Sequence, residues 1–182
     1  MDNIQGNLTV KSLDKLYESC RNSADISEKD FNIEGVVIDK NSLLLFNRGN
    51  GPNTKNGIFR IENWKKDDFD KPVFYPIPLP TVADTAFGFT DVIKIKDKIY
   101  FLAAAEGANS TYHDGEILGS IIGIINSKTM TLEKTQTISN HHKFEGITPF
   151  EIDGKSKTFL LCEDPDNGLQ ETVIYQLSFR IF

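Results

Sequence analysis

The sequence contains little of what several classes of protein require. Its two cysteines, Cys20 and Cys162, show no Cys-x-x-Cys or Cys-x-x-His spacing, which argues against a structural zinc site. No apolar run approaches the roughly 18 residues of a membrane-spanning helix. Basic residues are outnumbered, 20 against 26 acidic ones, and the net charge is −6. That balance argues against broad electrostatic binding to nucleic acid or to an anionic membrane.

The two cysteines do not form a disulfide framework, although a single bond between them stays open. Cys162 ends the apolar run Phe159–Cys162, which predicts a buried strand thiol, and Cys20 falls in a short helical segment. The first residues, Met1 to Gly6, have neither a basic region nor the apolar stretch of a secretory signal. The chain as given is therefore predicted to be cytoplasmic, unless it is the trimmed form of an exported protein.

What is present favours strands and turns. The 182 residues suffice for one well-cored domain, and they include 13 Phe, 13 Gly and 7 Pro. One short pattern, an aromatic residue followed by a carboxylate and an apolar strand, occurs three times. Its carboxylates lie 57 and then 54 positions apart, at Glu34, Asp91 and Glu145. A period of this size indicates a repeat architecture.

Residues 1–30 differ from this repeat. Asn7–Val10 is predicted to be a short strand. Apolar side chains recur at helical spacing from Leu13 to Cys20, and Ser12 is a suitable N-cap. We expect a helix that packs over a sheet edge.

Residues 31–182 are predicted to form three antiparallel modules, at about 31–80, 86–139 and 143–182. The first strand, Glu34–Asp39, carries a continuous apolar run and is predicted to be buried on both faces. Pro72–Leu79 contains three prolines, which suit only an edge strand. The third module lacks a fourth strand, which Asn7–Val10 would supply. The other predicted strands are 42–46, 57–62, 91–96, 98–105, 117–126, 132–138, 145–152, 157–162 and 171–179.

Four-stranded units at this spacing are typical of β-propeller blades. We prefer a partial propeller with a short N-terminal helix to a β-sandwich, because a sandwich does not explain the recurring carboxylate. Three blades are fewer than the roughly four to eight of closed propellers. The sequence therefore predicts either a truncated piece or a homodimer that completes a six-bladed ring, since a half-ring exposes apolar blade faces.

The openings Phe31–Val37 and Phe144–Ile147, with their Glu-Gly pairs, resemble those of bacterial six-bladed propellers of the esterase-like phytase and SdiA-regulated type. The closest resemblance is to an uncharacterised bacterial propeller family of that group, and it runs from about Phe31 to Phe179. It implies that the strand-head carboxylates line a central channel and hold Ca²⁺ or another divalent ion. The second module departs from the pattern, with Thr90-Asp91-Val92 in place of Glu-Gly.

Two interpretations of Glu34, Asp91 and Glu145 stay open. Residues at the heads of innermost strands converge, so the three carboxylates would supply oxygen ligands to Ca²⁺. Alternatively, each accepts hydrogen bonds from backbone N–H groups of the neighbouring blade and holds the blades in register.

A second set of candidates, Arg48, Glu106 and Glu163, follows the second strand of each module. We expect them on the opposite or outer rim, with Arg48 either binding an anion or pairing with Glu34. Salt bridging between blades is the preferred interpretation. Of the adjacent His141 and His142, at most one would share a site with Glu145, since neighbours in an extended chain point to opposite sides.

Two loops are poor candidates for a metal or ligand site. Glu163–Gly168 lacks the spacing of an EF-hand, and His113–Glu116 contains the remaining histidine. No nucleophile-elbow, zincin, P-loop or Rossmann motif is present. We therefore predict a non-catalytic binding module that uses its loop face or its acidic channel, with a protein, glycan or small molecule as ligand. The alternative is a calcium-dependent hydrolase of phosphate or carboxylic esters.

Overall fold

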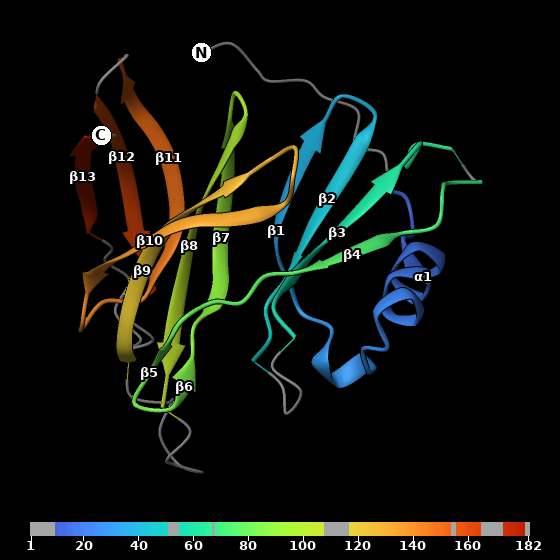
Figure 1. Ribbon diagram of the computed structural model, residues 1–182, viewed down its shortest axis with the longest axis horizontal. Coiled ribbons are helices and arrows are strands. Elements are labelled where there is room, and N and C mark those ends of the chain that lie inside the picture. Colours follow the sequence, from blue (N-terminus) through green and yellow to red (C-terminus); the bar gives the residue numbers. More distant parts are fainter. Residues whose placement is uncertain are drawn as a thin grey trace, which may run out of the picture.

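The computed structural model describes residues 10–50, 55–66, 68–107, 117–153, 156–164 and 173–180. Its architecture is all-β, with one α-helix and four antiparallel sheets that do not close into a barrel (Figure 1). No helix in these ranges combines the length and apolar character needed to cross a membrane.

Three of the sheets are meanders, in which consecutive strands pair antiparallel. The first sheet has the order β1-β2-β3-β4, the second β7-β8-β9-β10 and the third β11-β12-β13. The first comprises β1 (Ile33–Asp39), β2 (Ser42–Asn47), β3 (Gly57–Glu62) and β4 (Val73–Pro76). The second comprises β7 (Gly88–Ile95), β8 (Lys98–Glu106), β9 (Ile117–Asn126) and β10 (Thr131–Ser139). The third comprises β11 (Phe144–Ile152), β12 (Ser156–Glu163) and β13 (Ile174–Arg180).

The predicted strands agree closely with these bounds, and the third sheet has three strands as expected. β4 is the outer strand of its sheet, as its prolines predict. A two-stranded hairpin, β5 (Thr81–Val82) with β6 (Thr85–Ala86), was not predicted. The predicted strand Asn7–Val10 lies almost wholly outside the described residues, as do His113–Glu116 and most of Glu163–Gly168.

The helix α1 (Asp14–Ala24) and a 3₁₀ turn η1 (Glu28–Asp30) precede the sheets. The predicted N-cap is wrong, because the N-cap residue is Leu13. The hydroxyl of Ser12 instead accepts the N–H of Asp14 at 3.2 Å. The helix packs against the edge strand β4, as expected, and it also covers a sheet face. Leu16 and Cys20 share a core cluster with side chains of β2 and β3, namely Leu43, Leu45, Phe59 and Ile61.

The molecule is thus a row of layers with a core cluster at each junction. Phe46 of the first sheet meets Phe89 of the second, with ring centroids 5.4 Å apart. Tyr100 of the second meets Phe159 of the third at 5.2 Å. The first strands of the three sheets are neighbours, β1 beside β7 and β7 beside β11. In the view of Figure 1 all three run upward, so they begin on the same side of the molecule.

Two burial predictions are wrong. Glu34–Asp39 is not buried on both faces, since Val36 and Ile38 are 55% and 58% exposed while Val37 is buried. The reason is that β1 lies at the edge of its sheet and packs only one face against the second sheet. Cys162 is only partly buried, because it lies on the outer face of the third sheet, and Cys20 is the fully buried thiol. Both thiols are free, so no disulfide joins them.

Candidate functional site

The predicted site residues gather at one end of the sheets, which we call the strand-head rim. Antiparallel pairing sets the start of each first strand against the end of its neighbour, as in Ile33 opposite Asn47 and Phe144 opposite Glu163. The prediction that Arg48, Glu106 and Glu163 lie on another rim is therefore wrong. The rim carries Glu34, Arg48, Asp91, Glu106, His142, Glu145 and Glu163.

Four of these side chains, together with Lys143, form a chain of alternating charge across the three sheets. Arg48 donates from Nη1 to Glu34 Oε1 at 3.5 Å and from Nη2 to Glu106 Oε1 at 2.5 Å. Lys143 Nζ lies 3.4 Å from the same oxygen of Glu106 and 3.0 Å from Glu145 Oε1. The predicted pairing of Arg48 with Glu34 and the predicted salt bridging between modules are thus confirmed.

The cations of this chain are buried and the carboxylates are not. The side chains of Arg48 and Lys143 are 9% and 11% exposed. Those of Glu34, Glu106 and Glu145 are 30%, 32% and 32% exposed. The surface offered to solvent is therefore a set of carboxylate oxygens above two buried positive charges.

Local packing fixes the position of Arg48. A Cβ on Gly88 would stand 2.8 Å from Arg48 Cγ, so only glycine lets the arginine stem lie across the start of β7. The backbone N–H of Arg48 donates to Asn32 O at 2.7 Å. Arg48 Nε is buried and has no hydrogen-bond partner in the structure. The guanidinium is therefore held by its two carboxylate partners and by packing.

Sequence reasoning missed several residues that build the rim. Asn47 is fully buried, and its Oδ1 accepts the N–H of Asn32 at 3.0 Å. Asn56, also buried, donates to Phe87 O at 2.8 Å and ties the first sheet to the segment before β7. Lys143 immediately precedes the third strand head. A polar residue that directly ends or precedes an apolar strand is the signal that would have found Asn47 and Lys143.

Asp91 is bound to backbone. Its Oδ1 accepts the N–H of Val92 at 2.8 Å, and its Oδ2 accepts the N–H of Ile147 in β11 at 2.7 Å. Burial raises the pKa of this carboxyl, and the two backbone hydrogen bonds only partly oppose that effect. The geometry of Asp91 fits the blade-register alternative, whereas Glu34 and Glu145 face cationic side chains.

His142 pairs with Glu163 rather than with Glu145. Its Nδ1 lies 2.6 Å from Glu163 Oε2, and Tyr175 donates its hydroxyl to Glu163 Oε1 at 2.7 Å. The hydrogen bond to Glu163 is the main cause of a raised Tyr175 pKa. Ser120 fixes the backbone here by donating to His142 O at 2.6 Å. These contacts tie the segment before the third strand head to β9, β12 and β13.

The described residues contain no group of three or more His, Cys, Asp or Glu side chains placed to hold a metal ion. Both Asp91 oxygens accept N–H groups, and Glu34 and Glu145 are each ion-paired. In this arrangement the three carboxylates do not fit a shared Ca²⁺, which needs about six to eight oxygen ligands. The calcium site stays a prediction.

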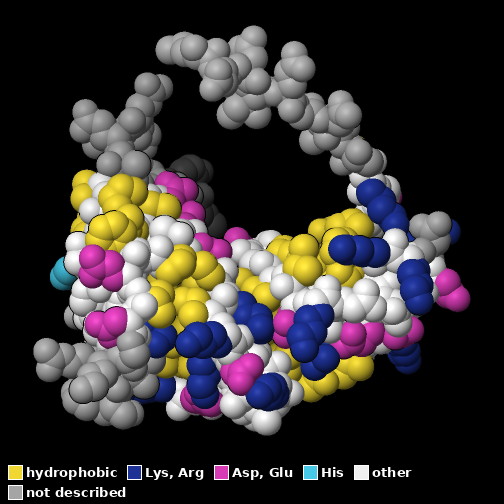
Figure 2. All heavy atoms as spheres, turned by 90° about the horizontal axis from the view of Figure 1, so that it is seen from above, with side chains coloured by type: hydrophobic (Ala, Val, Ile, Leu, Met, Phe, Trp, Pro, Cys, Tyr) yellow, Lys and Arg dark blue, Asp and Glu magenta, His cyan; other side chains and the backbone are white. Residues whose placement is uncertain are grey.

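The opposite end of the sheets, which carries the β1–β2 and β7–β8 turns, has a different character. Figure 2 looks onto this end and shows Lys and Arg side chains gathered over it. A hollow of about 460 Å³ there is lined by four cations and three carboxylates, and each of these carboxylates pairs with a cation. The cations are Lys40, Arg60, Lys94 and Lys128.

Comparison with protein families assigns the chain as a whole. The model of the family of unknown function DUF6929 matches residues 2–179. The chain belongs to this family. No curated protein matches this DUF6929 member. The family match covers all three sheets and α1, so the strand-head rim lies within the segment that defines the family.

Proposed function

We propose that this DUF6929 protein is a binding module with propeller-like blades that recognises a cationic group at the strand-head rim. The observation that carries the proposal is the difference in exposure along the charge chain. Its carboxylates are each about a third exposed, whereas Arg48 and Lys143 are about nine-tenths buried. A ligand that approaches the rim meets acceptor oxygens first.

The propeller-like arrangement is part of this proposal. Three meander sheets lie in a row with their first strands adjacent, as in the blades of a propeller. In such a layout the heads of the first strands lie close to one another, so a single ligand would contact several sheets. Fold alone does not assign a function, and the ligand class is argued here from the side chains.

An organic cation suits the rim better than a tightly chelated metal ion. The carboxylates alternate with Arg48 and Lys143, so no three of them meet at one point. An ammonium or guanidinium group needs only one or two carboxylate acceptors with the correct geometry. Because the buried cations offset most of the negative charge, we expect weak binding, with a dissociation constant near the millimolar range.

Titration calorimetry with two probes, a Gly-Arg-Gly tripeptide and CaCl₂, tests the proposal. We expect saturable binding of the tripeptide that Glu145→Gln weakens about threefold, which is the effect of one partly exposed charge. Glu151→Gln is the matched control, because Glu151 is an exposed carboxylate near the other end of the same strand. It should leave the affinity unchanged.

The same titrations test the alternative. Stoichiometric Ca²⁺ binding that is lost in Glu34→Gln and in Asp91→Asn would replace this proposal with the metal-dependent one, and with it the ester hydrolase. If neither probe binds, or if Glu151→Gln weakens binding as much as Glu145→Gln, the rim serves only to join the sheets.

A further inference from the structure

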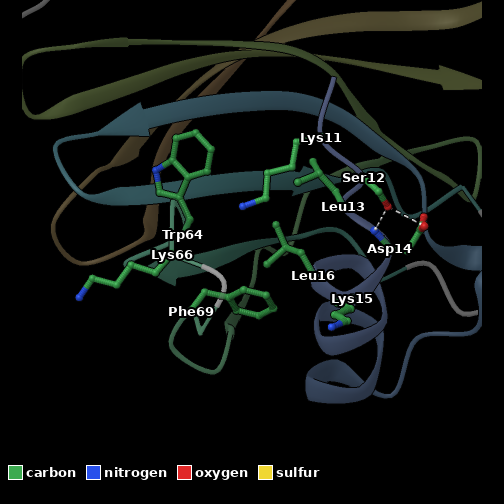
Figure 3. A pocket seen from close by; sticks show the side chains of 9 residues that line it. All are labelled: Lys11, Ser12, Leu13, Asp14, Lys15, Leu16, Trp64, Lys66 and Phe69. Atoms are coloured by element: carbon green, nitrogen blue, oxygen red, sulfur yellow. Dashed lines mark hydrogen bonds between the residues drawn. The ribbon is translucent and has the colours of Figure 1, made fainter. Parts of the chain in front are cut away.

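A groove of about 510 Å³ lies on the side of the molecule, between α1 and the segment that follows β3 (Figure 3). The residues that begin α1 form one wall, and Trp64, Lys66 and Phe69 form the other. Its volume falls in the range of sites that hold small molecules, about 300–1,000 Å³. The strand-head rim contributes none of its lining residues.

The floor of the groove is apolar. Leu16 is 3% exposed and belongs to the core cluster between α1 and the first sheet. Leu13, Trp64 and Phe69 are partly buried and pack against the same cluster. Leu13 and the two aromatic rings therefore present apolar surface that stays accessible to a ligand, and Leu16 lies buried beneath it. A ligand with an aromatic or alkyl body would bury this surface at about 25 cal/mol per Å².

The charges around this floor are mainly positive. Among the described residues, Lys11, Lys15 and Lys66 line the groove together with one carboxylate, Asp14. Figure 3 shows the Lys11 side chain extending between Trp64 and Leu16. A fourth cation, Lys65, places its Nζ 5.6 Å from the centroid of the Trp64 ring. A locally basic lining is unusual in a chain of net charge −6 and complements a negatively charged group.

We propose that this groove binds a small amphipathic anion, such as a medium-chain or aromatic carboxylate. The apolar body lies against Trp64, Phe69 and the leucines, and the carboxylate faces the lysines. The hydrophobic contact supplies most of the affinity, and the lysines select the sign of the charge.

The chain contains one tryptophan, Trp64, so its fluorescence reports on this groove alone. Sodium decanoate, below its micellar concentration, is the probe, and decylamine is the matched probe of opposite charge. We expect decanoate to shift the Trp64 emission saturably, with an affinity at least fivefold above that of decylamine. Lys15→Gln and Lys66→Gln should each weaken decanoate binding about threefold, as one exposed charge does. Lys128→Gln, an exposed lysine at the turn end, is the control and should have no effect.

Each other outcome overturns the proposal. Equal binding of decanoate and decylamine would mean an apolar groove without selection for anions. A Trp64 emission that does not change with either probe would mean that the groove is not a binding site. An equal effect of Lys128→Gln would assign the preference to the charge of the whole protein. Circular dichroism of each variant establishes that it is folded before titration.

Discussion

At the residue scale, the two cysteines differ in chemistry because their surroundings differ. Cys20 lies under α1 in the core cluster with the first sheet and is fully buried, and burial raises the pKa of its thiol to about 12. Cys162 lies on the outer face of the third sheet, with its Sγ over Gly146. The thiolate is the reactive species, so burial that opposes ionisation also opposes reaction.

We therefore expect one fast-reacting thiol in the native protein. At pH 8, Ellman's reagent should modify Cys162 rapidly and Cys20 only after denaturant is added. Cys162→Ser should abolish the fast phase and leave only the reaction of Cys20 in denaturant. Two thiols that react at the same rate in the native protein would contradict the burial of Cys20.

Asp91 makes a second prediction at this scale, on pH. Because burial raises its pKa in the folded state, the folded protein holds this proton more tightly than the unfolded chain does. The contribution of Asp91 to stability is thus fully present below its ordinary pKa of 3.8 and is lost as the pH rises through the raised value. The Asp91→Asn variant has no carboxyl proton at this position, so it lacks this dependence on pH. The free energy of unfolding of the variant, minus that of the wild type, should rise with pH in this window.

Urea denaturation of both proteins at several pH values from about 3.5 to 7 measures this difference. Carboxylates whose pKa is lowered, such as Glu62 and Glu133, titrate in both proteins, so their effects cancel in the subtraction. A difference that falls with pH would mean that the hydrogen bonds from Val92 and Ile147 outweigh the burial of the charge.

At the element scale, the sheets depend on glycines that are covered by an aromatic ring of the neighbouring strand. Gly123 of β9 pairs with Phe101 of β8, and a Cβ on Gly123 would stand 2.1 Å from the phenyl ring. A Cβ on Gly57 of β3 would likewise stand 2.3 Å from the ring of Phe74, although the residue that pairs with Gly57 in β4 is Pro76. In each case the ring lies over the glycine and occupies the space that a side chain at that position would take.

Gly123→Ala should therefore destabilise the protein by about 1–3 kcal/mol, because the rigid, fully buried Phe101 ring must move to admit a methyl group. Thermal or urea unfolding measures the loss. Thr135→Ala is the control, since Thr135 pairs with Gly123 from the other side, on the outer strand of the sheet. Its effect should stay within about 0.5 kcal/mol. A Gly123→Ala protein as stable as wild type would show that the ring is free to move.

At the scale of the whole molecule, the two ends of the row of sheets differ. α1 covers the outer face of the first sheet, the face that a closed ring of two chains would have to bury. On the third sheet, Phe159, Leu161 and Leu177 pack toward the second sheet, and the alternate residues face away from it. Ile174 is one of the residues that face away from the second sheet, and it is 58% exposed.

The predicted homodimer is therefore expected to form through the outer face of the third sheet, without closing a ring. Light scattering over a range of concentrations should show a mass that rises from 20.5 kDa toward twice that value. Ile174→Asp should keep the protein monomeric. Val36→Asp is the control, because Val36 is equally exposed but lies on β1. A wild-type monomer at all concentrations, or a dimer that Val36→Asp dissociates, would contradict this interface.

The sequence by itself determined the strands, their order and the recurrence of the strand heads. Alternating and continuous apolar runs, turn residues and the prolines before β5 act locally, so they can be interpreted without knowing the neighbours. The repeat placed Glu34 and Glu145 at equivalent β-bulges near the start of β1 and β11, but in β7 that position is held by Thr90, and Asp91 corresponds to Gly35 and Gly146.

Only the tertiary structure decided which side chains meet. Pairing of adjacent strands set Arg48 and Glu106 beside the carboxylates, and the junctions between sheets made Glu106 the shared partner of Arg48 and Lys143. Packing of α1 on the first sheet buried Cys20 and formed the groove at Trp64. These contacts join residues that are distant in the chain, so their distances depend on how layers stack, which no local pattern encodes.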